Sequence, residues 1–273
     1  MNIGLIDSGI GGLSVLRAFI AAGVPANFFY IADSGHLPYG TKSDAYIETR
    51  MEILTDFLVQ THQIDALVIA CNTATAVSAK SLRALYPNLP LIGIEPAIKP
   101  ATLLTKTRHI AVAATHSTIN SPRLKGLIER FATPSGITVH TIEAGPWVTL
   151  VESGEIYGEK AQQSIETLLN PYQFTRANHT FNTEKTVQID QFILGCTHFP
   201  FLREAIQNYL GDSVNLIDPA RSIVKQTLTL LPSAKNDQAS PHYHFYTTGD
   251  LSHFKTQLST LSFHIDQADA LTR

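Results

Sequence analysis

The sequence predicts an α/β protein with mainly parallel sheets, because short apolar runs alternate with segments of helical periodicity along most of the chain. Polar triplets directly follow several of these runs, where the next helix is expected to begin. Hydrophobic residues make up 44% of the chain and charged residues 16%, which excludes disorder or a coiled coil for the whole chain. At 273 residues, the chain is long enough for two lobes.

The first part of the chain contains four predicted strands, at residues 2–6, 27–32, 65–70 and 91–94. Each is an apolar run of the length typical of a buried strand. The intervening helices are predicted by apolar residues at helical spacing. We expect them to begin near Leu13, to span 43–62, and to follow Cys71 as far as about Leu85.

The second part of the chain repeats this pattern, with strands expected at residues 109–114, 137–142, 189–194 and 214–217. Helices are expected from about Ser117, after His198, and from Ala220 to about Leu231. A polar stretch at 170–188 and a turn-rich stretch at 232–241 are expected to be connections between elements.

The polar residues at the strand ends share one predicted edge of the sheets. In parallel sheets, ligands bind beyond the carboxyl ends of the strands, at helix N-termini. Each triplet could also serve only as an ordinary helix N-cap. The residues at this edge are Asp7-Ser8-Gly9, Asp33-Ser34-Gly35, Cys71-Asn72-Thr73, Thr115 and Cys196-Thr197-His198.

Several classes of function are disfavoured by the sequence. With 20 basic and 23 acidic residues, the net charge is −3, and no basic field exists to attract a nucleic acid. The glycines at 9–12 do not form a dinucleotide fingerprint, and the histidines lack metal-site spacing, so no cofactor or metal is predicted. No signal peptide or membrane span is visible, and we expect a cytoplasmic protein that does not bind membranes.

The chain has two cysteines, Cys71 and Cys196, and both lie between a predicted strand and a predicted helix. A helix N-terminus lowers the pKa of a thiol, so this position favours a reactive cysteine over an inert buried one. One such thiol in each half predicts a site between two similar lobes. We expect one lobe of residues 1–96 with 208–273, carrying Cys71, and a second of residues 97–207, carrying Cys196.

Four motifs contain both thiols and carry a resemblance to a known family. They are DSGIGGLSVL at 7–16, ADSGHLPYG at 32–40, ACNTATA at 70–76 and LGCTHFPFL at 194–202. With VESG at 151–154 and TTGD at 247–250, the sequence resembles the cofactor-independent glutamate racemases over nearly its whole length. The resemblance implies two α/β lobes with the active site in the cleft between them. It also implies a cytoplasmic enzyme that makes D-glutamate for peptidoglycan, and so for the cell wall and cell shape. Many relatives form homodimers, so the resemblance also allows a homodimer here.

The resemblance also implies which residues move the proton. Cys71 would take the α-proton from D-glutamate and Cys196 from L-glutamate, each returning a proton in the opposite direction. Asp7 is expected beside Cys71, and Glu152 and His198 near Cys196, as groups that handle protons or set protonation states. The ordinary alternatives are an N-cap for Asp7, a packing role for His198, and a solvated or capping carboxylate for Glu152.

The residues expected to bind the substrate include no lysine or arginine. Backbone N–H groups and small polar side chains would therefore hold the two carboxylates of glutamate. The expected residues are Asp7, Ser8, Pro38, Tyr39, Gly40, Asn72, Thr73, Thr75, Thr197 and His198.

Three other functions stay open on the residues alone. The chain could racemise a related acidic amino acid such as aspartate, or hydantoins, although DSGIGG and His198 favour glutamate. It could be a non-catalytic module that binds a dicarboxylate, or a cysteine hydrolase, which pairs one cysteine with an oriented histidine. The presence of two equivalent thiols disfavours both of these. One departure from the family pattern is Gly145-Pro146, where many members have Cys-Pro, and it weakens the placement of Glu152.

Overall fold

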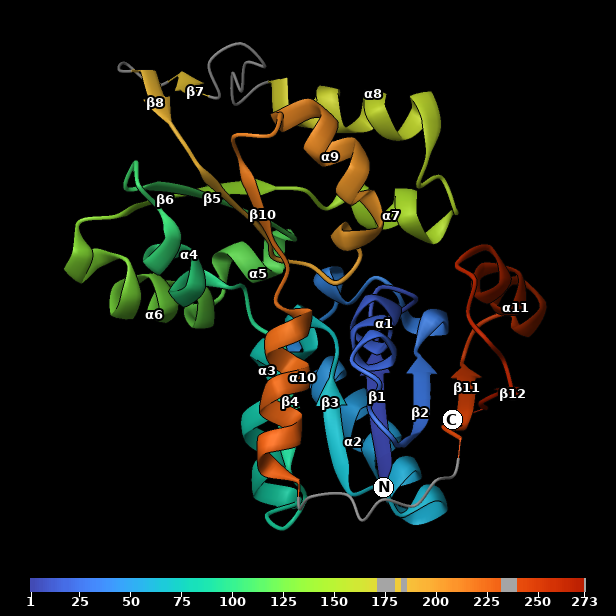
Figure 1. The fold of residues 1–273 in the computed structure, drawn as a ribbon. Coiled ribbons are helices and arrows are strands. Elements are labelled where there is room, and N and C mark those ends of the chain that lie inside the picture. The colour runs from blue at the N-terminus through green and yellow to red at the C-terminus, as the bar shows by residue number, and fades with distance from the viewer. Residues whose placement is uncertain (171–179, 183–185, 232–239, 273) are drawn as a thin grey trace. The chain divides into compact units, whose positions relative to one another are not determined.

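The computed structural model describes residues 1–170, 180–182, 186–231 and 240–272 (Figure 1). The chain forms two compact units: unit 1 is Met1–Ile94 with Ala220–Arg273, and unit 2 is Glu95–Pro219. The chain therefore returns to unit 1 later than the expected position of 208. The physical reason is that strand β10 (Asn215–Ile217) pairs with β9 (Gln191–Leu194) of unit 2.

Unit 1 is built on one six-stranded sheet in which all neighbouring strands are parallel. The strand order is β12-β11-β2-β1-β3-β4. Strand β1 lies inside the sheet, and its Ile3, Leu5 and Ile6 are fully buried, because helices cover both faces of such a sheet. The strands are β1 Asn2–Asp7, β2 Asn27–Ala32, β3 Ala66–Ile69, β4 Leu91–Gly93, β11 Tyr243–Thr247 and β12 Gln267–Ala270.

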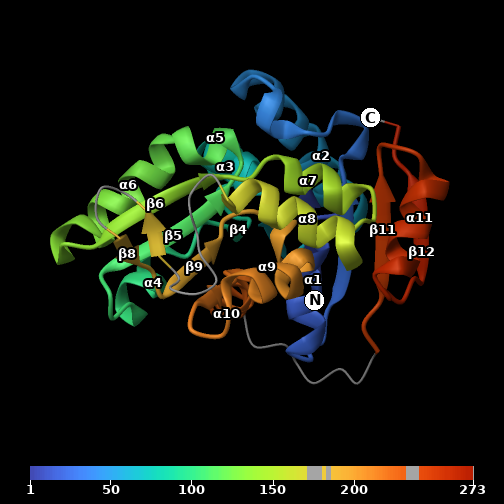
Figure 2. The same ribbon diagram turned by 90° about the horizontal axis from the view of Figure 1, so that it is seen from above.

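The helices of unit 1 lie on opposite faces of this sheet (Figures 1 and 2). Across the sheet, the chain moves in one direction from β1 to β2 and in the opposite direction from β2 to β3. Because parallel crossovers are right-handed, the helices of these two connections lie on different faces of the sheet. Helix α2 accordingly packs with α3, and α1 packs with α10. The helices are α1 Leu13–Ala21, α2 Asp44–His62, α3 Asn72–Leu85, α10 Ala220–Leu230 and α11 Leu251–Thr260, with short 3₁₀ turns η1 Ser34–His36 and η2 Tyr39–Thr41.

Unit 2 has a four-stranded parallel sheet in the order β10-β9-β5-β6, with β5 spanning His109–Ala114 and β6 spanning Thr138–Glu143. A separate antiparallel pair joins β7 (Thr180–Asn182) and β8 (Thr186–Gln188). Helix α4 packs with α6, and α8 packs with α9. The helices are α4 Ile98–Leu104, α5 His116–Asn120, α6 Pro122–Phe131, α7 Pro146–Glu152, α8 Gly158–Leu169 and α9 Arg203–Leu210, with 3₁₀ turns η3 Thr133–Ser135 and η5 Phe199–Leu202.

The two mainly parallel sheets confirm the predicted α/β class, and the predicted strands lie within a few residues of the observed ones. The single helix expected from about Ser117 is instead two helices, because Ser121 caps a new helix that begins at Pro122. Of the two predicted connections, 171–179, 183–185 and 232–239 lie outside the described residues. No helix in the described ranges combines the length and apolar character needed to cross a bilayer.

Candidate active site

Cys71 occupies the N-cap position of helix α3. Strand β3 ends at Ile69, and Cys71 has extended backbone angles (φ −128°, ψ 123°) before the helix begins at Asn72. Its Sγ accepts the backbone N–H of Ala74 at 3.5 Å, in the way that a serine or aspartate oxygen usually caps a helix. The residue is only 7% exposed. The sulfur therefore lies at the positive end of a 14-residue helix, which stabilises negative charge there.

Asp7 and Ser8 reach the same edge because β1 runs parallel to β3, with Ile6 opposite Ile69. The Cys71 thiol donates to Ser8 Oγ at 3.8 Å. Asp7 is fully buried, and its Oδ2 accepts the N–H groups of Gly9 at 3.2 Å and Gly12 at 3.0 Å.

Gly12 fits tightly against this edge of the sheet. A Cβ atom at Gly12 would lie 2.8 Å from the Cβ of Asp7 and 2.9 Å from the Cβ of Ala70, so only glycine permits this close approach. The Asp7 carboxylate and the glycine backbone thus hold one another in place beside the end of β3.

The first turn of α3 contributes three buried polar side chains, Asn72, Thr73 and Thr75. Neither the Oδ1 nor the Nδ2 atom of Asn72 has a hydrogen-bond partner among the described residues, although the residue is only 6% exposed. A buried amide normally has hydrogen-bond partners, so the Asn72 amide is available to bind a polar group. The Thr75 hydroxyl instead donates to the Ile69 carbonyl at 3.2 Å, and its methyl group packs against Gly93.

Tyr39 brings a third segment to the Cys71 side. It is only 2% exposed and belongs to the same buried cluster as Cys71, whereas its neighbours Pro38 and Gly40 are more exposed. Its hydroxyl donates to Asp33 Oδ2 at 2.6 Å. Burial and the Asp33 carboxylate raise the pKa of Tyr39 above its usual range, so the phenol stays neutral.

Cys196 follows strand β9 in unit 2 and is 8% exposed. Gly195 precedes it, and a Cβ at Gly195 would lie 2.7 Å from the Ala113 carbonyl oxygen, so glycine is needed for this close approach. Cys196 Sγ lies 3.5 Å from His198 Nδ1, and His198 Nε2 lies 2.6 Å from Glu152 Oε1. The structure thus brings Cys196, His198 and Glu152 together, and Thr197, between the cysteine and the histidine, is buried as well.

His198 is fully enclosed between a sulfur and a carboxylate. Burial lowers its pKa, but hydrogen bonds and charge interactions with Cys196 and Glu152 outweigh burial and raise the pKa well above 6.5. The imidazole is therefore protonated at neutral pH, and its positive charge lies beside the sulfur of Cys196.

The expectation of a helix N-terminus directly after each cysteine is wrong for Cys196. Residues Phe199–Leu202 form a 3₁₀ turn, and helix α9 begins only at Arg203. Pro200 has no backbone N–H to donate, and Phe199 packs edge-on against Trp147 at 5.1 Å between ring centroids. The environment of Cys196 is thus built from side chains, and that of Cys71 from a helix end.

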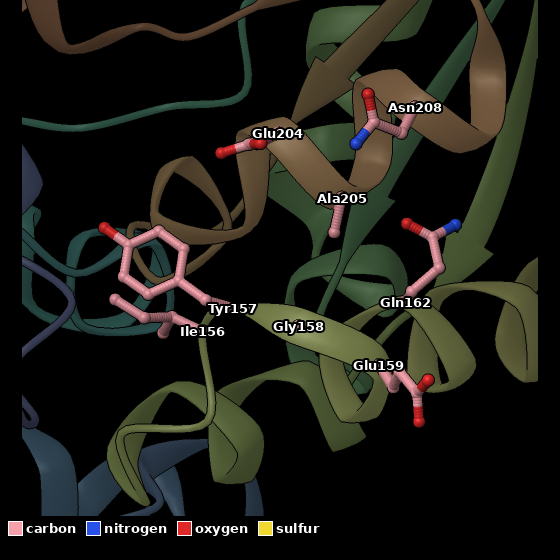
Figure 3. A pocket seen from close by; sticks show the side chains of 8 residues that line it. All are labelled: Ile156, Tyr157, Gly158, Glu159, Gln162, Glu204, Ala205 and Asn208. Atoms are coloured by element: carbon pink, nitrogen blue, oxygen red, sulfur yellow. The ribbon is translucent and has the colours of Figure 1, made fainter.

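A groove of about 360 Å³ lies between the start of α8 and helix α9 in unit 2 (Figure 3). It contains neither cysteine, and the two carboxylates and lack of lysine or arginine in its lining disfavour a dicarboxylate ligand. Elsewhere in the described ranges, no group of three or more His, Cys, Asp or Glu could hold a metal ion. The groove is lined by Ile156, Tyr157, Gly158, Glu159, Gln162, Glu204, Ala205 and Asn208.

A family model described as Asp/Glu/Hydantoin racemase matches residues 13–227. The chain belongs to the Asp/Glu/hydantoin racemase family. The activity of this family member is that of an amino-acid racemase, an isomerase.

Curated relatives and solved structures agree with this family. A glutamate racemase of Ectopseudomonas mendocina is 35% identical over 261 residues, covering 95% of this chain and 94% of the relative. A glutamate racemase of Pseudomonas aeruginosa is 37% identical over 88% of this chain and 87% of the relative.

Two solved glutamate racemases match the fold of this racemase over nearly its whole length. The Escherichia coli enzyme, in complex with L-glutamate and the activator UDP-MurNAc-ala, has a TM-score of 0.85 at 27% identity and covers 99% of this chain and 98% of its own. The Francisella tularensis enzyme, in complex with D-glutamate, has a TM-score of 0.77 at 28% identity and covers 99% and 97%.

Proposed function

We propose that this racemase interconverts L- and D-glutamate by passing the α-proton between Cys71 and Cys196. The observation that carries the proposal is that each unit holds one buried thiol at the end of a strand, and that each thiol has neighbours able to stabilise a thiolate. Curated relatives at 35% and 37% identity carry the name glutamate racemase, and solved relatives bind L- and D-glutamate.

The reaction uses one thiolate and one thiol at a time. The Cys71 thiolate removes the α-proton of D-glutamate, and the Cys196 thiol gives a proton to the opposite face of the resulting carbanion, which yields L-glutamate. The two cysteines have then exchanged protonation states, and the reverse reaction restores them. Such an exchange requires the two sulfur atoms to reach opposite faces of the α-carbon.

The residues around Cys71 suit an anionic amino acid. The first N–H groups of α3 and the amide of Asn72 would donate to a substrate carboxylate, and these bonds would strengthen as charge develops in the transition state. Asp7 keeps a carboxylate at this edge of the sheet, where it would meet the substrate ammonium group. Ser8, Thr73 and the Pro38–Gly40 segment complete the proposed contacts, with Thr197 and His198 on the Cys196 side.

The Cys196–His198–Glu152 arrangement also resembles the site of a cysteine hydrolase, since a thiol, an imidazole and a carboxylate follow one another at 3.5 Å and 2.6 Å. A hydrolase, however, has no use for a second thiol at a helix N-terminus. The racemase proposal uses both cysteines, and the family match supports it.

The physiological role follows from the product. D-glutamate enters the stem peptide of peptidoglycan, so we place this racemase in the cytoplasm, where it supplies cell-wall biogenesis and thereby maintains cell shape. We propose that it needs no cofactor, and that it works as a homodimer, as many relatives do.

The test is incubation with L-glutamate in deuterated water without added cofactor, followed by circular dichroism and mass spectrometry. We expect the optical signal to decay and α-deuterium to appear first in D-glutamate, because the proton on the second thiol comes from solvent. Aspartate in parallel tests the related-substrate alternative. No exchange with glutamate would overturn the proposal, and early deuterium in recovered L-glutamate would overturn the two-base scheme.

A further inference from the structure

Asp33 forms the centre of a buried polar cluster in unit 1 that the reaction scheme does not use. It follows strand β2 and is fully buried. Arg50 of α2 donates to it twice, through Nε at 3.1 Å and Nη2 at 2.8 Å. The Tyr39 hydroxyl donates at 2.6 Å, and the Thr248 hydroxyl donates at 2.8 Å.

Thr248 belongs to the TTGD motif at 247–250, to which the resemblance assigned no role. The motif joins the cluster over a separation of 215 residues in the sequence. Its contact with the turn after β2 is close: the Gly35 N–H donates to Thr248 Oγ1 at 3.1 Å, and a Cβ at Gly35 would lie 2.6 Å from the Thr248 carbonyl oxygen.

The cluster holds Tyr39 in one position. A fully buried carboxylate needs a counter-charge and a full set of donors, and the rigid fork of an arginine supplies two donors in a fixed plane. Arg50 and Thr248 already donate hydrogen bonds to the Asp33 carboxylate, so the Tyr39 hydroxyl can approach this carboxylate from only one direction. The 3₁₀ turn η2, which contains Tyr39, packs against α3, the helix that Cys71 caps, so the position of Tyr39 bears on how Cys71 is enclosed.

We propose that Asp33, Arg50 and Thr248 form a clamp that positions Tyr39, and with it the Pro38–Gly40 segment, over Cys71. The three are positioning residues that act through Tyr39, and the clamp serves the Cys71 side only. The consequence for substrate binding rests on the proposed function, whereas the consequence for the enclosure of Cys71 does not.

The test compares Tyr39→Phe and Thr248→Val with the matched control Thr55→Val. Thr55 is fully buried on α2, and its hydroxyl has no partner among the described residues, so its loss removes no hydrogen bond. The readout is the rate at which iodoacetamide alkylates each cysteine of the substrate-free protein, measured on peptides by mass spectrometry. A buried thiol reacts through local opening, so its rate reports how tightly it is enclosed.

We expect Cys71 to react about fivefold faster in Tyr39→Phe and Thr248→Val, the factor that corresponds to one lost hydrogen bond. Cys196 should react at the wild-type rate in both, and Thr55→Val should match the wild type at both cysteines. Equal acceleration at both thiols would show general loosening and overturn the clamp, as would an unchanged rate at Cys71.

Activity gives a second readout. In both variants, we expect the KM for glutamate to rise more than kcat falls, because the binding segment is displaced while the thiols remain. Arg50→Lys keeps the charge but not the fork, and should fall between the wild type and Arg50→Met. A fall in kcat alone would overturn the clamp. If the wild type did not racemise glutamate, the proposed function would fail, but the alkylation result would still decide the clamp.

Discussion

Cys71 and Cys196 both follow a strand of a parallel sheet, yet their neighbours stabilise negative charge by different means. At Cys71, the sulfur accepts the N–H of Ala74 at the start of α3 and donates to the Ser8 hydroxyl, and both of these groups are uncharged. At Cys196, the partner is the protonated ring of His198, which Glu152 holds at 2.6 Å. Backbone dipoles do not titrate, whereas an imidazolium does. The comparison predicts that the two halves of one reaction respond differently to pH and to mutation.

The largest effect is expected from removing either sulfur. Cys71→Ser and Cys196→Ser should each lower kcat by about 10³-fold or more, the upper range for loss of a general acid or base, because a serine hydroxyl is a far weaker acid than a thiol. The measurement is racemisation followed by circular dichroism. A variant that keeps even a tenth of the wild-type rate would contradict the assignment of that cysteine.

The next effect separates the two sites. His198→Asn should lower kcat by about 10²-fold and change the alkylation profile of Cys196, because the sulfur loses the ring nitrogen that lies 3.5 Å away. Cys71 should keep its wild-type alkylation profile, which makes it the internal control. If both profiles moved together, the two thiolates would share one electrostatic environment and the contrast would be wrong.

A smaller effect is expected at Asn72. Asn72→Ala should raise the KM for glutamate about tenfold, through loss of one charge-assisted hydrogen bond. It should leave the stability of the ligand-free protein unchanged or higher by about 1 kcal/mol, because the buried amide has no partner to lose within the described residues. Thermal unfolding with and without glutamate measures both. If the ligand-free variant were less stable than the wild type, Asn72 would have a structural role and the prediction would be wrong.

The smallest effect concerns the pH dependence of stability. The folded-state pKa of His198 is raised well above 6.5, so its contribution to stability is fully present below about pH 6.5 and is lost as the pH rises through the raised value. The difference in unfolding free energy between the wild type and His198→Asn should therefore shrink toward alkaline pH. Urea unfolding from about pH 6.5 into the alkaline range measures this difference in unfolding free energy. A difference that grew with pH would contradict the prediction.

Much of the architecture could be predicted from the sequence because its strands are short, continuous apolar runs. Strand β11 (Tyr243–Thr247) was missed because histidine, tyrosine and threonine interrupt its apolar pattern. The helix expected after Cys196 was wrong because Pro200 favours a 3₁₀ turn there.

The chemistry of the two cysteines was predictable only in part. The motifs pointed to Cys71, Cys196, His198 and Glu152, and the structure brings the last three together. Arg50 could not be found, because nothing local marks one arginine on α2 as the partner of Asp33. The same holds for the unpartnered amide of Asn72, since the absence of a partner is a property of the folded chain.

The division of unit 1 between two stretches of sequence has a consequence for the order of synthesis. When a ribosome has made residues 1–94, strand β2 is still an edge strand, because its neighbour β11 belongs to residues 243–247. The whole of unit 2 is translated in the interval. During that time β2, with the sequence NFFYIA, presents an unpaired apolar edge of the kind that recruits other chains. The nascent chain therefore exposes this apolar strand until about the last tenth of the polypeptide emerges.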